Sequence, residues 1–261
     1  MQEQKDYILI AEDLTKTFSG FVALQQVSLK VRRGAIHGII GPNGAGKTTL
    51  FNLLAGSLNP DSGRVIFNGY NATRFKPNER TQLGLARTFQ NIRIFGEMSV
   101  LENVMVGRHC RSRAGTLYVT FQIPFKKTHQ EKEIQKNALE CLKFTGLYNR
   151  KDMKACNLPY GEQRRLELAR ALATEPKLLL LDEPVAGMNS AETEGIITLL
   201  TRINELGTTI LLIEHKMDFI MSISNLISVL NFGNKICEGT SDEVRKSPEV
   251  IEAYLGKETN N

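Results

Sequence analysis

A glycine-rich segment between a predicted strand and a predicted helix constrains the fold of this chain more than any other feature. The apolar run at 37–40 leads directly into GPNGAGKT at 41–48, and leucines then recur at helical spacing until Gly56. The segment matches the phosphate-loop pattern GxxxxGK followed by Ser or Thr, with the strand before it and the helix after it that this pattern requires. The sequence therefore predicts a phosphate-binding loop on an α/β fold.

The chemistry expected of this loop follows from its backbone. Glycines let N–H groups turn inward around phosphate oxygens, and the N-terminus of the following helix adds about half a positive charge. Lys47 is expected to reach the β- and γ-phosphates, and the Thr48 hydroxyl to hold Mg²⁺. The plain alternative is a glycine-rich turn with an unrelated lysine. The residues predicted to bind nucleotide here are Gly41, Pro42, Asn43, Gly44, Ala45, Gly46, Lys47, Thr48 and Thr49.

Two adjacent carboxylates follow a second apolar run, in LLLLDE at 178–183. The run predicts a buried strand, so Asp182 and Glu183 are expected at its C-terminal edge, beside the phosphate loop of such a sheet. Asp182 is predicted to bind the Mg²⁺ shell, and Glu183 to polarise an attacking water as general base. The plain alternative is that both acids cap the strand before Pro184.

The pattern along the chain predicts three kinds of structure. The first forty residues alternate apolar and polar positions, which indicates β-strands. Residues from about 84 to 159 predict a mostly helical lobe. After Gly161 strands and helices alternate, with one helix starting at Asn189, which predicts a parallel sheet covered by helices. The strands expected in this last part lie at 178–181, 209–213 and 226–230.

Composition places the chain among ordinary globular proteins. Of its 261 residues, 41% are hydrophobic and 23% charged, which excludes disorder, collagen-like repeats and coiled coil. No apolar stretch approaches the roughly 18 residues of a membrane-spanning helix, and a signal peptide is not expected. The widely spaced cysteines suit a reducing compartment. The net charge of +5 fits phosphate ligands, nucleic acid or an anionic membrane surface, without choosing among them.

Five segments together resemble the ATP-binding subunits of ABC transporters, over almost the whole chain. In the order of that family, the similar segments are GPNGAGKT (Walker A), RTFQN at 87–91 (Q-loop), LPYGEQ at 158–163 (signature), LLLLDEP at 178–184 (Walker B) and IEHK at 213–216 (switch histidine). The resemblance implies one ABC cassette over residues 1–261. Its P-loop NTPase parallel-sheet core with an N-terminal antiparallel β subdomain would occupy 1–85 and 161–261, and an inserted helical lobe 86–160.

The resemblance also implies the ligands ATP and Mg²⁺ and roles for further residues. Phe18 falls where the family places an aromatic residue that stacks on adenine. Gln90 would contact Mg²⁺ or water and sense a membrane subunit, and His215 would bind the γ-phosphate. The implied catalytic residues are Glu183, His215 and Gln90; the implied metal-binding residues are Thr48, Gln90 and Asp182; the implied nucleotide contacts across a dimer are Tyr160, Gly161 and Glu162.

The signature segment departs from the family pattern LSGGQ. Pro159 stands at the serine position and Tyr160 at the first glycine, so only Gly161 keeps its place. Proline has neither a hydroxyl nor an N–H, which leaves Gly161 and the helix N-terminus to receive a γ-phosphate. The family's D-loop aspartate is replaced by Asn189.

Longer stretches resemble the branched-chain amino acid uptake subunits, including a basic insertion at 108–127 and the ending VIEAYLG at 250–256. The resemblance implies a head-to-tail dimer with a second ATP-binding subunit, a paralogue or the same chain. It also implies two membrane permeases, an external substrate-binding protein, and a peripheral position at the cytoplasmic face of the inner membrane, with no nucleic acid. Two alternatives stay open, a cassette for export or lipid transport and a soluble ABC ATPase that acts on nucleic acid or ribosomes.

Overall fold

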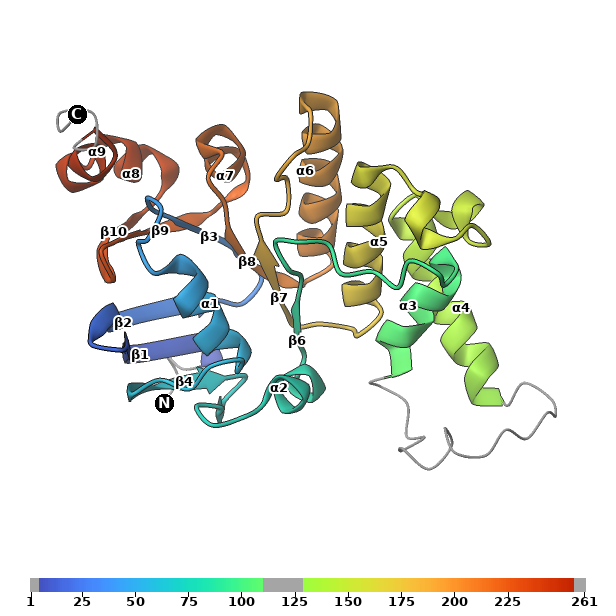
Figure 1. Ribbon diagram of the computed structural model, residues 1–261, viewed down its shortest axis with the longest axis horizontal. Helices are drawn as coiled ribbons and strands as arrows, with labels where there is room; N and C mark the ends of the chain where they lie inside the picture. The colour runs from blue at the N-terminus through green and yellow to red at the C-terminus, as the bar shows by residue number, and fades with distance from the viewer. Residues whose placement is uncertain (1–4, 110–128, 256–261) are drawn as a thin grey trace. The chain divides into compact units, whose positions relative to one another are not determined.

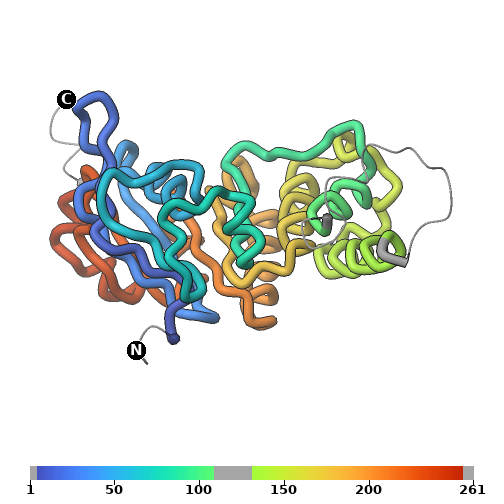
Figure 2. The backbone as a smooth tube through the Cα atoms, turned by 90° about the horizontal axis from the view of Figure 1, so that it is seen from below, coloured from blue at the N-terminus to red at the C-terminus, as the bar shows by residue number. Residues whose placement is uncertain are grey.

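The helices and strands of the chain belong to two units. The computed structural model describes residues 5–109 and 129–255. We call Met1–Arg87 with Lys177–Asn261 the core unit, and Thr88–Pro176 the helical unit. The chain passes from the core unit into the helical unit after Arg87 and returns after Pro176, as the tube in Figure 2 traces.

An antiparallel sheet opens the core unit. Among the described residues it has the strand order β2-β1-β4-β5. Its strands are β1 (Tyr7–Phe18), β2 (Phe21–Arg32), β4 (Ser62–Phe67) and β5 (Tyr70–Asn71). Buried and exposed residues alternate over much of β2, which is the pattern of a sheet with one face on the core. The predicted N-terminal antiparallel subdomain is therefore confirmed.

A second, mostly parallel sheet carries the rest of the core unit. Within the described ranges its strand order is β10-β9-β3-β8-β7-β6, and only the pairing of β10 with β9 is antiparallel. All residues of β3, β7 and β8 are buried, as expected for parallel strands covered on both faces. The strands are β3 (Ile36–Ile40), β6 (Leu85–Arg87), β7 (Leu178–Asp182), β8 (Thr209–Ile213), β9 (Leu226–Asn231) and β10 (Asn234–Gly239).

Helices cover both faces of this parallel sheet. Gly38 of β3 lies under Ile220 of α7, since a Cβ at Gly38 would stand 2.7 Å from the Ile220 side chain. The next residue, Ile39, belongs to the core cluster that contains α1, and successive strand residues point to opposite faces. Figure 1 shows α7 and α1 on opposite faces accordingly. The helices of this unit are α1 (Lys47–Ala55), α2 (Pro77–Leu83), α6 (Ser190–Glu205), α7 (Met217–Ile223), α8 (Ser241–Lys246) and α9 (Pro248–Leu255).

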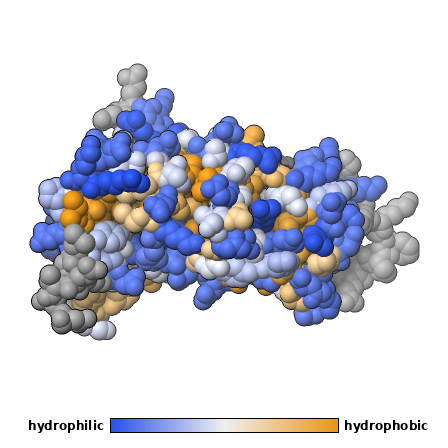
Figure 3. All heavy atoms as spheres, turned by 90° about the horizontal axis from the view of Figure 1, so that it is seen from above, coloured by the Kyte–Doolittle hydropathy of each residue, from blue (hydrophilic) through white to orange (hydrophobic). Residues whose placement is uncertain are grey.

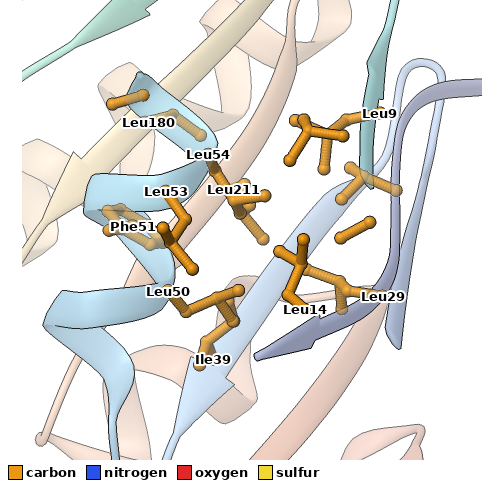
Figure 4. Packing of buried hydrophobic residues seen from close by; sticks show 14 of the residues in the cluster. Leu9, Leu14, Leu29, Ile39, Leu50, Phe51, Leu53, Leu54, Leu180 and Leu211 are labelled. Atoms are coloured by element: carbon orange, nitrogen blue, oxygen red, sulfur yellow. The ribbon is translucent and has the colours of Figure 1, made fainter. Parts of the chain in front are cut away.

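Helix α1 packs between the two sheets of the core unit. Its Leu50, Phe51, Leu53 and Leu54 are fully buried. They meet leucines of the antiparallel sheet and of the parallel sheet in one cluster, which Figure 4 shows from close by. Because both ends of the phosphate-binding loop join buried elements, β3 and α1, this core fixes the loop.

Arg80 of α2 is a fully buried charge that holds the end of α1. Its guanidinium donates hydrogen bonds to the carbonyls of Leu53 and Leu54, and at 2.6 Å to the carbonyl of Ala72. Burial lowers the pKa of Arg80 to about 10, so the side chain stays charged at neutral pH. It bonds to carbonyls of the last turn of α1, and the carbonyl of Leu53 also accepts from the Gly56 N–H at 3.2 Å.

The capping of α6 agrees with the sequence. The Asn189 side chain accepts a hydrogen bond from the Glu192 N–H at 2.9 Å, and the Glu192 carboxylate accepts one from the Asn189 N–H at 3.1 Å. This reciprocal pair is a capping box. Asn189, at the position of the family's D-loop aspartate, therefore starts a helix.

The helical unit is built around α3 (Val100–His109), α4 (His129–Phe144) and α5 (Tyr160–Leu172), with short 3₁₀ turns at Tyr148–Arg150 and Ala155–Asn157. Its core contains Val104 of α3, Leu142 of α4 and Leu166 of α5. Because α5 buries its apolar face here, this unit ends at Pro176, whereas the sequence placed the boundary at residue 160. Residues 110–128, most of the basic insertion, lie outside the described residues.

In the part of the chain that the structure describes, no helix is long and apolar enough to cross a membrane. On the face drawn in Figure 3 most residues are hydrophilic, and apolar ones are scattered among them.

Candidate functional site

The predicted phosphate-binding loop lies between β3 and α1, and two of its glycines are required by their surroundings. A Cβ at Gly41 would stand 2.1 Å from the Leu230 carbonyl oxygen, and a Cβ at Gly46 would stand 2.6 Å from the Ala23 carbonyl oxygen. Both glycines have positive φ, 152° and 99°, which other residues rarely adopt. The backbone here passes too close to its neighbours for any side chain.

Lys47 begins α1 and turns its charge back over the loop. It is only 6% exposed, and its Nζ donates hydrogen bonds to the carbonyls of Gly41 at 2.7 Å and Pro42 at 2.9 Å. The N-cap residue is Gly46, which has no side chain to cap the first N–H groups of the helix. The loop therefore combines an ammonium group with the N-terminus of a helix, two features that favour an anion.

The two predicted carboxylates occupy the end of β7. Since β8 is the only strand between β3 and β7 in the described sheet, and all three are parallel, the phosphate-binding loop and Asp182 follow strand ends at the same edge. Asp182 is 6% exposed. Ligands of open parallel sheets bind at the carboxyl ends of their strands.

An ion pair that the sequence analysis missed holds Asp182. Arg87, the last residue of β6, lies 3.2 Å from the Asp182 Oδ2 and donates a 2.7 Å hydrogen bond to the Asn52 side chain of α1. Arg87 therefore connects the end of β7 to the helix that follows the loop. The only indication of Arg87 in the sequence was that it begins the segment RTFQN.

Glu183 and His215 form a hydrogen-bonded pair. The distance from the Glu183 Oε1 to the His215 Nε2 is 2.7 Å, and the side chains are 15% and 43% exposed. The backbone of Glu183 is left-handed, with φ of 48°, a conformation that costs about 1–3 kcal/mol outside glycine and is frequent at functional sites. The structure thus brings together two residues that lie far apart in the sequence.

Glu214 is a second residue that the sequence analysis did not identify. Its carboxylate is 2% exposed and accepts hydrogen bonds at 3.0 Å from the backbone N–H groups of Val185 and His215. It therefore joins the turn after Glu183 to the residue that pairs with Glu183. The only indication of Glu214 in the sequence was its position directly before His215, after a predicted strand.

Phe18 ends β1 in the hairpin that borders the loop. It is 42% exposed, and the Lys16 Nζ lies 5.5 Å from its ring centroid. The β9–β10 turn connects this hairpin to the loop, because the Gly233 N–H donates to the Ala45 carbonyl at 3.1 Å and the Gly233 carbonyl accepts from Gln25 at 2.8 Å. Phe18 is therefore partly exposed on the hairpin that the β9–β10 turn connects to the loop.

The remaining predicted residues lie in the helical unit. Gln90 follows the strand β6, and its carbonyl accepts a 2.9 Å hydrogen bond from Arg164 of α5. Pro159 is the N-cap residue of α5 and makes no side-chain bond to the helix, Tyr160 is 45% exposed, and Gly161 is buried. The Glu162 carboxylate lies 3.6 Å from the Arg150 Nε.

A buried ion pair anchors the backbone around Gln90. Arg164 and Glu167 are 0% and 2% exposed and meet at 2.8 Å. Arg164 also donates to the Phe89 carbonyl at 2.8 Å, and Glu167 accepts from the Phe89 N–H at 3.3 Å. Both members of this α5 ion pair therefore hold the segment that contains Gln90.

Arg164→Met is expected to lower the free energy of unfolding by about 3–5 kcal/mol, because it leaves Glu167 as a buried charge without its partner. Urea unfolding followed by circular dichroism measures this. Arg165→Met, the same change on the neighbouring, half-buried residue, is the matched control and is expected to have a much smaller effect. Equal losses in the two variants would contradict the anchoring role.

Comparisons with known proteins agree with this geometry. Residues 24–186 match the family model described as ABC transporter, and residues 234–259 match the model described as branched-chain amino acid ATP-binding cassette transporter. The chain is 40% identical over 251 residues to the high-affinity branched-chain amino acid transport ATP-binding protein LivG of Salmonella typhimurium, covering 96% of this chain and 98% of the relative.

Solved structures give the same result. The ADP conformation of MJ1267, an ATP-binding cassette of an ABC transporter, is 36% identical with a TM-score of 0.84, covering 96% of this chain and 99% of that one. The dimeric post-hydrolysis structure of the cassette MJ0796 with ADP and Pi is 27% identical with a TM-score of 0.73, covering 89% and 98%. The chain therefore belongs to the ATP-binding proteins of ABC transporters, and within them to the branched-chain amino acid transport ATP-binding proteins.

Proposed function

We propose that this chain binds and hydrolyses ATP and thereby powers a membrane importer for branched-chain amino acids. One observation carries the catalytic part: the Glu183–His215 pair, at 2.7 Å, follows strands β7 and β8 at the edge of the sheet where β3 leads into the Lys47 loop. The names of the relatives, which are branched-chain amino acid transport ATP-binding proteins, support the substrate class.

The loop and its neighbours fit a nucleotide. Gly41 and Gly46 let the loop pack directly against the Leu230 and Ala23 carbonyls, and the N–H groups at 41–49 would surround phosphate oxygens. Lys47 would exchange the carbonyls of Gly41 and Pro42 for the β- and γ-phosphates, and the partly exposed Phe18 would stack on adenine.

Mg²⁺ fits the oxygen donors that the core unit offers at this edge, because oxygen ligands are those that Mg²⁺ prefers. The Thr48 hydroxyl and the Asp182 carboxylate would hold it, and Gln90 is proposed as a further ligand on the family resemblance alone. When bound, the ion would neutralise negative charge on the phosphates. Arg87, 3.2 Å from the Asp182 Oδ2, would keep the carboxylate oriented.

Glu183 is the proposed general base. Its carboxylate would accept a proton from the attacking water, and its hydrogen bond to His215 would fix its direction. His215 would also hold the γ-phosphate. Gln90 would orient water from its segment, which Arg164 and Glu167 anchor on α5.

The proposed working form is a head-to-tail dimer with a second ATP-binding subunit, a paralogue or the same chain. Each ATP would lie between the Lys47 loop of one subunit and the segment of Tyr160, Gly161 and Glu162 of the other. The similar cassette MJ0796 is dimeric in a structure with ADP and Pi, which supports a dimer. Because the N-cap Pro159 has no side-chain donor, Gly161 and the first turn of α5 would supply the contact.

The proposed partners are two membrane permeases and, through them, an external substrate-binding protein, without nucleic acid. The chain would act as a peripheral subunit at the cytoplasmic face of the inner membrane. Closure of the dimer on ATP and its reopening after hydrolysis would be passed to the permeases by the helical unit.

Co-purification tests the transport assignment. Tagged Glu183→Gln protein is expressed in native cells, membranes are solubilised gently with ATP present, and the captured proteins are identified, with an untagged strain as control. Two permease chains and a second ATP-binding subunit are expected. Capture of ribosomes or nucleic acid, or of no membrane protein, would contradict it.

A further inference from the structure

Two short segments meet at the strand ends that carry the Glu183–His215 pair. We call residues 183–188, between β7 and the N-cap of α6, the Glu183 turn, and residues 214–216, between β8 and α7, the His215 segment. The backbone N–H of Glu183 donates to the Ile213 carbonyl at 3.0 Å, directly before the His215 segment. The two segments therefore lie side by side, although α6 and β8 separate them in the chain.

The Glu214 carboxylate bonds to the backbone of both segments. Its Oε1 accepts from the Val185 N–H of the Glu183 turn at 3.0 Å. Its Oε2 accepts from the N–H groups of His215 at 3.0 Å and Lys216 at 3.4 Å. Glu214 is 2% exposed, and an ionised carboxylate accepts hydrogen bonds without donating any. Its two oxygens therefore match two segments that each present an N–H group.

Lys216 joins the same two segments a second time. Its Nζ donates to the carbonyl of Met188, the last residue of the Glu183 turn, at 3.0 Å. Because the ammonium is charged, this bond is of the stronger, charge-assisted kind. The Glu183 turn is thus bonded to the His215 segment at Val185, through Glu214, and again at its end, through Lys216.

The Glu183 turn needs this support because it begins with a strained residue. Glu183 has a left-handed φ of 48°, a conformation that persists only where the surrounding contacts over-determine it. The His215 side chain is 43% exposed, so its direction depends on the backbone that carries it as well as on its bond to Glu183. The bonds made by Glu214 act on the backbone of both members of the pair.

We propose that Glu214 and Lys216 are positioning residues. They hold the Glu183 turn and the His215 segment in the relative position that places the side chains of the Glu183–His215 pair 2.7 Å apart. The proposal rests on the role of general base proposed above for Glu183. Misplacing a reacting group by about 1 Å can lower a rate about 10²-fold. Loss of these bonds is therefore expected to lower kcat and to leave ATP binding unchanged.

Glu214→Gln in the full chain tests the proposal, because it keeps the shape of the side chain and replaces one oxygen by an NH₂ group. That group cannot accept from a backbone N–H, so one of the two segments loses its bond. The kcat for ATP hydrolysis is expected to fall about tenfold, with the Kd for ATP, measured by calorimetry, within about twofold of wild type. A wild-type kcat in Glu214→Gln would overturn the proposal.

Glu238→Gln is the matched control. The Glu238 carboxylate also accepts bonds, from Ser228 and Lys235, but its strand β10 is separated from β7 by β9, β3 and β8 in the described sheet. Wild-type turnover is expected in this variant. An equal fall of kcat in Glu214→Gln and Glu238→Gln would contradict a role specific to Glu214.

A double variant, Glu183→Gln with Glu214→Gln, separates positioning from general damage. Residues that act as a unit have non-additive effects. If Glu214 acts through Glu183, the second change is expected to lower the remaining rate by less than about threefold. A further tenfold loss, which independent effects would give, would overturn the proposal.

Lys216→Met is a second single variant, which leaves the buried carboxylate in place because Lys216 is exposed. It is expected to lower kcat about threefold with the Kd for ATP kept. Lys246→Met, the same change at an exposed residue of α8, is its control, and equal kcat values in the two lysine variants would overturn the role of Lys216. Failure of the wild-type chain to hydrolyse ATP would instead overturn the proposed function itself.

Discussion

Glu183→Gln is expected to lower the rate of ATP hydrolysis by about 10²- to 10⁴-fold and to leave ATP binding close to wild type. The amide has nearly the shape of the carboxylate but cannot accept a proton from water at neutral pH. It can still bond to His215, whose Nε2 lies 2.7 Å from the Glu183 Oε1, so the local structure is expected to persist. Phosphate release and ATP titration on the same preparation measure the two properties.

The control for this prediction is Glu205→Gln. Glu205 is the exposed last residue of α6, in the same unit as Glu183. It carries the same chemical change away from the site and is expected to hydrolyse ATP normally. A Glu183→Gln protein that turns over ATP at the wild-type rate would remove Glu183 from the role of general base.

Lys47→Ala is expected to weaken ATP binding about 10- to 100-fold, because hydrogen bonds to a charged group contribute about 1.5–3 kcal/mol. The ammonium lies over the loop, bonded to the carbonyls of Gly41 and Pro42. Removing it leaves two carbonyl dipoles facing the place proposed for the phosphates. Titration with ATP and Mg²⁺ measures the effect.

Lys246→Ala is the matched control for that experiment. Lys246 is an exposed residue at the end of α8, and its removal changes the net charge of the chain by the same amount. Normal ATP affinity in Lys47→Ala, or an equal loss in Lys246→Ala, would show that the proposed contact with phosphate is wrong.

The sequence predicted those parts of the site whose signal is local. The loop at 41–48 is recognisable because its glycines, its lysine and the flanking strand and helix are contiguous. Asp182 and Glu183 are recognisable because a buried strand ends directly before them. The pairing of parallel strands then brings these segments to one edge of a sheet, which makes the fold class predictable as well.

The parts that escaped prediction depend on partners far away in the sequence. The pairing of Arg87 with Asp182 spans 95 residues, and the bond from Val185 to Glu214 spans 29. The residues next to Arg87 and Glu214 in the sequence do not indicate which distant group each side chain will contact. The boundary of the helical unit was placed differently for a similar reason, since α5 buries its apolar face against α3 and α4.

Short elements were also missed. Strand β6 has 3 residues and β5 has 2, which is too few for an alternating pattern to be read. Helix α9 has 8 residues, about two turns, which is too short for a helical period to be read from the sequence. The place of such short elements is decided by the packing of the core unit and becomes visible only in the structure.

Uptake of branched-chain amino acids by intact cells is the most direct test of the central claim. The native gene is replaced by the Glu183→Gln variant, and the initial rate of uptake of radiolabelled leucine at low concentration is compared with that of cells carrying Glu205→Gln. Loss of leucine uptake in the first strain only, with uptake of lysine unchanged in both, is the result predicted. Unchanged leucine uptake in the Glu183→Gln strain would contradict the proposal that ATP hydrolysis by this chain powers the import of branched-chain amino acids.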